Sequence, residues 1–372
     1  MQPIRIATIG TSPISDNLLD AARRLDDFAY VGTLSRDAGH ATEFTARHGG
    51  TTPFSSLEEL CACPEVDAVY VASPNALHHG QALACVEAGK HVLVEKPLCP
   101  NRHQAEALFA AARLHDVVAL EAMRPIHDPA WAAIFAALPR LGRLRRATLR
   151  FGRYSSRYDE VLAGRQTNIF DARMATGALM DMGVYTVSPM VALFGAPERV
   201  VSAVTLAADA RCRETGGAVD GAGSALCTFG AGSGAPGLVA ELSWSKVTQD
   251  LLPSQIEGEL GTITIDAVSK PGRVTLRLRG QAVRADATST STSVGDVVEE
   301  LPLDPCDNTM VFELRDFARL VRRERVQTLW GTALDAAAAE ANFRDVTLGE
   351  LAVTDEIRRQ AGVFFPADNR VE

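Results

Sequence analysis

The sequence predicts an α/β protein of two domains: an N-terminal, doubly wound parallel sheet and a C-terminal α+β domain whose large open sheet is mostly antiparallel. One reason is length, because 372 residues exceed what a single hydrophobic core usually holds. The other is a change of pattern near residue 124. Before it, short apolar runs alternate with helical patterns, and beyond it several strands follow one another without helices between them. We therefore expect domains at residues 1–124 and 125–372.

The first domain is expected to alternate strands with helices throughout. The expected strands are Ile4–Ile9, Phe28–Leu34, Ala68–Ala72, His91–Val94 and Val117–Glu121. The expected helices are Pro13–Leu25, Ala38–His48, Asn75–Ala88 and Asn101–Leu114. This alternation implies right-handed crossovers and parallel pairing. A doubly wound sheet of this kind binds ligands beyond the carboxyl ends of its strands.

The second domain is expected to be built on one large sheet. Its expected strands are Leu144–Arg153, Val200–Ala207, Ser224–Phe229, Leu238–Trp244, Gly261–Asp266 and Val274–Leu278. Its expected helices are Pro129–Leu138, Gly177–Leu193, Asn308–Arg322, Thr332–Asn342 and Leu348–Ala361. The Ser- and Thr-rich segment Ala285–Gly295 is expected to be a surface loop. Because open sheet faces and edges tend to pair with another subunit, we expect a homodimer or homotetramer.

Charge and composition favour small-molecule chemistry over binding to a polymer or a membrane. The net charge of −9 leaves no electrostatic footprint for nucleic acid or an anionic membrane. No run of about 18 apolar residues predicts a membrane span, and the N-terminus lacks the layout of a signal peptide. The cysteines are odd in number, and Cys61 and Cys63 lack the further ligands of a metal site. We therefore expect a cytoplasmic protein with unpaired thiols and no bound metal.

A candidate phosphate-binding turn follows the first expected strand. It consists of Gly10, Thr11, Ser12, Pro13 and Ile14. A full dinucleotide fingerprint would have further glycines, so the motif alone is weak, and an ordinary strand–turn–helix is the alternative. Ser12 is nevertheless a good N-cap and Pro13 suits the first helical position. The free N–H groups of a helix that begins there suit a pyrophosphate.

The end of the second expected strand bears on the choice of cofactor. An NAD site usually places an acidic side chain there, to bind the ribose 2′-hydroxyl. Ser35 and Arg36 instead offer a hydroxyl and a guanidinium, which suit a 2′-phosphate. NADP(H) is therefore favoured, while Asp37 keeps NAD(H) possible. The alternative is that Arg36 is a solvated residue in front of a helix.

Several segments resemble the motifs of one oxidoreductase family. Residues 72–97 contain P-N-x-x-H, then A-G-K-H-V, then E-K-P; residues 177–185 read G-A-L-M-D-M-G-V-Y. Residues 121–129 contain E-A-M-R and H-D-P, and residues 357–366 match the usual ending. Over nearly its whole length, the chain resembles the glucose–fructose oxidoreductase, inositol dehydrogenase and rhizopine catabolism (Gfo/Idh/MocA) family. It departs from many members in having Ser12 for a glycine, and from most in having Tyr185 for a histidine. A tyrosine there resembles the dihydrodiol dehydrogenase and glucose–fructose oxidoreductase branch, and also some deoxysugar ketoreductases.

The resemblance implies a Rossmann domain and a set of site residues. Ser73, Pro74, Asn75, His78, Glu95 and Lys96 would contact the cofactor, and Pro97 would follow a cis peptide bond. Hydride transfer to or from a secondary alcohol needs a proton donor and acceptor, and a cation at the reacting oxygen. Lys96 is the candidate cation and Tyr185 the candidate acid–base. Asp181, one helical turn before Tyr185, is expected to reach the same cleft.

Each candidate also has a structural interpretation. Lys96 could be a surface lysine and Tyr185 a core tyrosine with a satisfied hydroxyl. Asp181 is harder to dismiss, because an unpaired carboxylate in an apolar helix is costly. The candidate substrate contacts are Arg124, Arg157, Tyr158 and Asn168, with Lys246 a weaker one.

These residues predict an NAD(P)-dependent oxidoreductase acting on CH–OH groups. Its substrate would be a sugar, a polyol, a vicinal diol or the matching ketone. One alternative is a glycoside hydrolase that uses NAD for transient oxidation. Another is a non-catalytic, NADP-sensing regulator, although a sensor would need neither Lys96 nor Tyr185.

Overall fold

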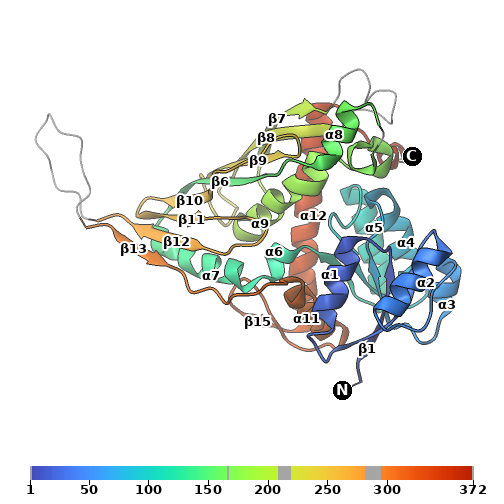
Figure 1. Cartoon of the computed structure of the whole chain (residues 1–372). Helices are drawn as coiled ribbons and strands as arrows, with labels where there is room; N and C mark the ends of the chain where they lie inside the picture. The colour runs from blue at the N-terminus through green and yellow to red at the C-terminus, as the bar shows by residue number, and fades with distance from the viewer. Residues whose placement is uncertain (1, 166, 208–218, 281–294, 371–372) are drawn as a thin grey trace, which may run out of the picture.

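The computed structural model describes residues 2–165, 167–207, 219–280 and 295–370. Within these ranges the chain forms a five-stranded sheet, an eight-stranded sheet and a short two-stranded ribbon. Figure 1 shows the N-terminal sheet and its helices on one side, the large sheet on the other, and the long helix α12 between them. Residues 285–294 of the expected surface loop, and Cys212, lie outside the described ranges.

The N-terminal sheet confirms the doubly wound prediction. Its strands are all parallel and lie in the order β2-β1-β3-β4-β5. They are β1 Ile4–Ile9, β2 Phe28–Leu34, β3 Ala68–Val71, β4 His91–Glu95 and β5 Ala119–Ala122. The helices between them are α1 Pro13–Ala22, α2 Ala38–Arg47, α3 Leu57–Ala62, α4 Asn75–Glu87 and α5 Arg102–Leu114. The sequence prediction missed α3, because six residues are too few to show a helical period.

The second sheet confirms the mostly antiparallel prediction. Its order is β13-β12-β11-β10-β6-β9-β8-β7, and only the central pair β6–β9 is parallel among the strands described. The strands are β6 Leu144–Gly152, β7 Arg199–Leu206, β8 Asp220–Thr228, β9 Val239–Ser245, β10 Ser254–Gly258, β11 Gly261–Ile265, β12 Val274–Leu278 and β13 Val297–Glu300. Strands β10 and β13 were not predicted. Both are short and carry several polar residues, so their apolar signal is weak.

Helix α9 Val184–Phe194 lies on one face of the large sheet. All of its residues are buried, and they share a core with inward-facing sheet residues such as Leu242 and Ile256. The stretch Ala172–Phe194 is long and apolar enough to cross a membrane by length and composition alone. However, 89% of its most apolar window is buried inside the protein, as is usual for a core helix. Before the sheet, the chain forms α6 Arg124–His127 and α7 Pro129–Ala137.

The C-terminal helices return to the first sheet. Helix α11 Met310–Val321 shares a core with β1 and β3, in which Phe317 packs with Ile6 and Tyr70. Helix α12 Ala336–Ala361 contacts both α5 of the first domain and α9 of the second. Residues far beyond position 124 thus help to cover the first sheet, and the domain boundary at 124 stays a prediction.

One expected break in the C-terminal helices is wrong. The sequence predicted two helices, Thr332–Asn342 and Leu348–Ala361, but the structure has the single helix α12. No proline interrupts residues 343–347, and Gly349 serves packing instead of ending a helix. A Cβ atom at Gly349 would lie 2.7 Å from Val191 Cγ1, so glycine allows α12 to approach α9 closely.

Candidate active site

A hollow of about 490 Å³ lies beyond the carboxyl ends of β1, β2 and β3. Gly10 directly follows β1 and has φ +107°, and a Cβ atom there would lie 2.7 Å from the carbonyl oxygen of Ala72, so the turn requires glycine. Ser12 is the N-cap of α1 and Pro13 its first residue, as expected. The Ser12 Oγ atom is buried and has no partner among the described residues. Such a turn, open at a helix N-terminus, suits a pyrophosphate.

Most of the predicted cofactor residues line this hollow. They are Gly10, Thr11, Ser12, Ser35, Arg36, Ser73 and Pro74. Pro13 and Ile14 do not, and Ile14 packs against the core below α1 instead. Ser55, Ser56 and Leu57 also line it, and no motif in the sequence pointed to them.

Asp37 and Arg36 differ in the contacts that they make within the protein. The Asp37 carboxylate caps α2 by accepting the backbone N–H of His40 at 2.9 Å, which holds the pKa of Asp37 below its ordinary value. Arg36 lines the hollow, is exposed, and has no ion-pair partner in the described part of the chain. The guanidinium is therefore free to meet an anionic ligand, while Asp37 is already used by the fold.

Lys96 and Asp181 meet at the carboxyl end of β4. The Lys96 ammonium donates to the Asp181 carboxylate at 2.7 Å and to the Asp181 backbone carbonyl at 2.9 Å. Asp181 lies in a π turn, Leu179–Gly183, which leads into α9. Such wider turns recur at functional sites, and this one presents both oxygen groups of Asp181 to one ammonium. Two segments 85 residues apart in the sequence are thereby joined.

Tyr185 completes the cluster from the first turn of α9. The Lys96 ammonium lies 4.9 Å from the centre of the Tyr185 ring, within cation–π range. The Tyr185 hydroxyl oxygen accepts a hydrogen bond from the Arg124 guanidinium at 3.1 Å. Only 7% of Tyr185 is exposed, and its ring packs edge-on against Phe151. The structure thus brings together Lys96, Asp181, Tyr185 and Arg124, four of the predicted site residues.

A second lysine, Lys246, also pairs with the Asp181 carboxylate. Burial would raise the pKa of Asp181, but the charges of Lys96 and Lys246 outweigh it and hold that pKa well below its ordinary value. Burial would likewise lower the pKa of Lys96, but the carboxylate of Asp181 outweighs it and raises that pKa. Both groups are therefore charged at neutral pH.

Neighbouring residues hold the backbone of the cluster. The Glu95 carboxylate accepts the Tyr70 hydroxyl at 2.5 Å, and burial raises the pKa of Glu95. The two ring nitrogens of His78 lie 2.9 Å from the Pro97 carbonyl and 2.8 Å from the Ser73 carbonyl. His78 is buried and is not among the residues that line the hollow, so it braces the two turns around the site.

Two further backbone features lie next to the cluster. The Asn75 amide donates to the Ala175 carbonyl at 2.9 Å and so ties α4 to the segment before the π turn. The Lys96–Pro97 peptide bond is cis, as the resemblance implied.

Family models match both halves of the chain. An oxidoreductase-family model with an NAD-binding Rossmann fold matches residues 4–122, and the C-terminal domain model of the Gfo/Idh/MocA proteins matches residues 138–264. The chain belongs to the Gfo/Idh/MocA family.

Named relatives match either nearly the whole of this chain or about half of it. It is 34% identical to the scyllo-inositol 2-dehydrogenase (NADP(+)) of Bacillus subtilis (strain 168), over 98% of this chain and 99% of the relative. It is 34% identical to the trans-1,2-dihydrobenzene-1,2-diol dehydrogenase of Mus musculus, over 54% of this chain and 57% of that one. A crystal structure of a 3-ketoreductase from Actinomadura kijaniata, in complex with TDP-benzene and NADP, superimposes with a TM-score of 0.73. It is 25% identical and covers 98% of this chain and 100% of that one.

Three other predicted substrate contacts lie on a separate segment of this family member. Arg157 and Tyr158 belong to the short helix α8 Ser156–Leu162, and Asn168 begins a single 3-10 turn. The Tyr158 ring packs at a tilt against Phe170, with 5.6 Å between the ring centres. In the ranges described, none of the three hydrogen-bonds or pairs with the Lys96 cluster, so their contact with substrate stays a prediction.

Sequence reasoning missed how the second sheet supports the π turn. The carboxylate of Asp220, at the start of β8, accepts the backbone N–H of Leu179 at 2.8 Å and the indole N–H of Trp244 at 2.7 Å. Burial raises the pKa of Asp220 to about 6. A lone aspartate before a strand carries no sequence signal for this role.

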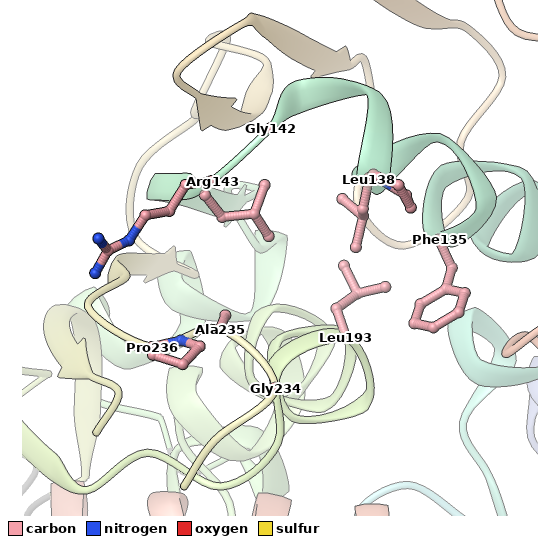
Figure 2. A pocket seen from close by; sticks show the side chains of 10 residues that line it. Phe135, Leu138, Gly142, Arg143, Leu193, Gly234, Ala235 and Pro236 are labelled. Atoms are coloured by element: carbon pink, nitrogen blue, oxygen red, sulfur yellow. The ribbon is translucent and has the colours of Figure 1, made fainter. Parts of the chain in front are cut away.

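A second hollow, of about 500 Å³, lies in the second domain between the end of α7 and α9. Figure 2 shows Leu138 and Leu193 pointing toward one another across it, with Arg143 at its rim. Its lining is otherwise uncharged, so it offers no acid–base pair. Within the described ranges no group of three or more His, Cys, Asp or Glu side chains is placed to hold a metal ion.

Proposed function

We propose that this chain is an NADP(H)-dependent oxidoreductase that transfers a hydride between nicotinamide and a secondary alcohol or ketone. The substrate would be a polyol, a sugar or a vicinal diol, as for the named relatives. The observation that carries the proposal is the cluster of Lys96, Asp181, Tyr185 and Arg124 at the carboxyl end of β4. That edge of the sheet also holds the dinucleotide hollow.

The cluster supplies each group that the reaction needs besides the cofactor. NADP(H), when bound, supplies or accepts the hydride. The Tyr185 oxygen already accepts from Arg124, so its own O–H is left to donate a proton to the substrate oxygen in reduction, and its oxygen takes that proton back in oxidation. Lys96 and Arg124 place positive charge beside the oxygen at which negative charge develops.

The Asp181 carboxylate is suited to bind the substrate through hydrogen bonds, and not to transfer a proton to or from the substrate. Its side chain is 37% exposed although both oxygens face lysines, so lone pairs remain open to the cleft. Because two ammonium groups hold its pKa far down, the carboxylate stays ionised and accepts hydrogen bonds only. A second substrate hydroxyl, next to the reacting carbon, is the natural donor.

Cofactor choice rests on Arg36 and Ser35. Both line the hollow, Arg36 has a free guanidinium, and Asp37 is used as a helix cap. A 2′-phosphate would pair with Arg36 bidentately. One relative carries NADP(+) in its name, and the crystal structure of another holds NADP.

We further propose that the protein acts in the cytoplasm. Cys61, Cys63, Cys85, Cys99, Cys227 and Cys306 are free thiols in the structure. Free thiols in this number are usual in a reducing compartment.

The test is a turnover assay on purified protein with Lys96→Met. Scyllo-inositol, myo-inositol and trans-1,2-dihydrobenzene-1,2-diol are offered with NADP(+), and NADPH formation is followed at 340 nm. Wild type should oxidise at least one of them. Lys96→Met should lower kcat by roughly 10²- to 10³-fold, as for removal of one oxyanion-stabilising group, with NADPH affinity measured by calorimetry unchanged.

Lys270→Met is the matched control. Lys270 is exposed and its ammonium donates to the Asp307 carbonyl at 2.7 Å, away from the site. This variant should keep wild-type turnover. A Lys96→Met protein with the turnover of wild type would contradict the proposed mechanism.

A further inference from the structure

Lys246 is a buried cation that the chemistry of the proposed reaction has not used. It directly follows β9, and its side chain is 4% exposed. A buried ammonium is costly unless it is paired. Its partner is the Asp181 carboxylate, on the Oδ2 atom, while Lys96 binds the Oδ1 atom of the same group.

The backbone of Lys246 is fixed on both sides. Its N–H donates to the Gly221 carbonyl of β8 at 2.9 Å, and its carbonyl accepts the N–H of Ser155, which caps α8, at 2.9 Å. The large sheet therefore delivers this ammonium to the π turn, where it meets the carboxylate oxygen of Asp181 that Lys96 does not bind.

The charges of the three groups show what the second lysine adds. Lys96 and Asp181 alone would form a neutral pair, and the carboxylate would cancel most of the field that Lys96 exerts on a nearby oxygen. With Lys246 the three side chains carry a net charge of about +1, by the ordinary ionisation of these residue types. These three groups therefore stay net positive although Asp181 is ionised. Arg124 adds positive charge at Tyr185, and the buried Glu95 carboxyl, whose pKa burial raises, also faces Lys96.

We infer that Lys246 is a positioning residue of the active site: it binds the far oxygen of Asp181, fixes the carboxylate toward the cleft and leaves the charge of Lys96 effective. The inference rests on the proposed function. It assigns the second domain a part in the chemistry besides substrate contact, through an ammonium that is 4% exposed and binds the Asp181 carboxylate.

The experiment compares Lys246→Met, Lys246→Arg and the control Lys270→Met in the same polyol and diol assay, across a range of pH. Lys246→Met should lower kcat/KM by roughly 10- to 100-fold, a loss typical of a misplaced catalytic group. Loss of Lys246 should raise the pKa of Asp181, because a carboxylate that loses an opposite charge titrates higher, so the acid limb of the pH profile should move to higher pH. Lys246→Arg, which keeps the charge, should restore the position of the limb.

Two further measurements make the outcome decisive. NADPH affinity should be unchanged in Lys246→Met, which separates positioning from cofactor binding. In the background of Asp181→Asn, Lys246→Met should cost little more activity, because the residue acts through Asp181. A Lys246→Met protein with wild-type kcat/KM and a wild-type acid limb would overturn the inference.

Failure of the proposed function gives a different result. If wild type oxidises none of the substrates, thermal unfolding is measured for Lys246→Met, Asp181→Asn and the double variant. The loss of stability in the double variant is then compared with the sum of the two single losses. Non-additive losses at Lys246 and Asp181 would show that the two side chains interact in the folded protein, as the positioning role requires, whereas additive losses would overturn it.

Discussion

The Tyr185 hydroxyl holds a defined place in the cluster, because its oxygen accepts from Arg124 and its ring lies under the Lys96 ammonium. Tyr185→Phe keeps the ring and removes the proton. We expect kcat to fall by roughly 10²- to 10⁴-fold, the usual contribution of a general acid–base group, with NADPH affinity unchanged in calorimetry. Tyr30→Phe, in β2, is the control and should keep its turnover. Equal loss in both variants would argue for a structural role.

Arg36 is expected to decide between the two nicotinamide cofactors. Arg36→Ala removes the guanidinium that lines the hollow. Loss of a charge-assisted hydrogen bond is worth about 1.5–3 kcal/mol, so NADPH affinity should fall by roughly 10- to 100-fold while NADH affinity stays constant. Parallel calorimetric titrations check this, with Arg113→Ala on the exposed side of α5 as the control. If Arg36→Ala binds NADPH as tightly as wild type does, Arg36 does not determine the preference for NADP(H).

At the scale of elements, Glu121 ties three of them together behind the site. One carboxylate oxygen accepts the backbone N–H of Leu98, just after the cis-proline turn, and the other accepts the Thr347 hydroxyl of α12, both at 2.8 Å. Burial, with a smaller contribution from the nearby charge of Glu95, raises the pKa of Glu121 to about 7. The ends of β4 and β5 and helix α12 thus share one buried carboxyl.

This carboxyl predicts a pH dependence of stability. The folded-state pKa lies above the ordinary value of 4.5, so the folded protein binds the proton more tightly than the unfolded chain. The contribution of Glu121 is therefore most favourable below pH 4.5, and is lost as the pH rises toward 7. Each unit of such a shift is worth about 1.4 kcal/mol.

Glu121→Gln should remove that dependence, because an amide does not titrate in this range. Wild type should have the advantage in thermal midpoint at pH 5, and this advantage should shrink at pH 8. Glu106→Gln, an exposed partner of Arg102, should leave the pH dependence as in wild type. A constant difference between wild type and Glu121→Gln across this range would contradict the prediction.

At the scale of the whole molecule, one face of the large sheet is covered by α9 and the other carries exposed apolar side chains. Val201 and Leu226 are opposite one another on β7 and β8, and are 48% and 49% exposed. Val239, on β9, is 40% exposed. Contiguous apolar surface on a sheet marks an interaction site, so we propose that this face pairs two copies into a homodimer or a homotetramer.

Sedimentation velocity tests this assembly. Leu226→Asp would bury a charge in the interface and should yield monomers at micromolar concentration. Leu114→Asp, at an isolated leucine of α5 that is 82% exposed, should leave the assembly unchanged. A monomeric wild-type protein would rule out the proposed interface.

Much of the fold and part of the site could be predicted because their signals are local. Gly10 needs its positive φ within one turn, Ser12 and Pro13 begin α1, and alternating apolar residues identify the strands. The short α3 gave no period, and the unbroken α12 depended on the fit of Gly349 against Val191. Local sequence signals do not predict those elements whose bounds depend on packing against distant segments.

The sequence by itself determined the two layered sheets, the dinucleotide turn and the residue types of the cluster, because hydrogen-bonding preference and hydrophobic period are carried by neighbouring residues. Only the tertiary structure decided that Lys96 and Lys246 share Asp181, that His78 faces backbone carbonyls, and that Glu121 joins α12 to the site. These contacts join segments far apart in the chain, mostly by tens of residues or more, and depend on how whole elements pack.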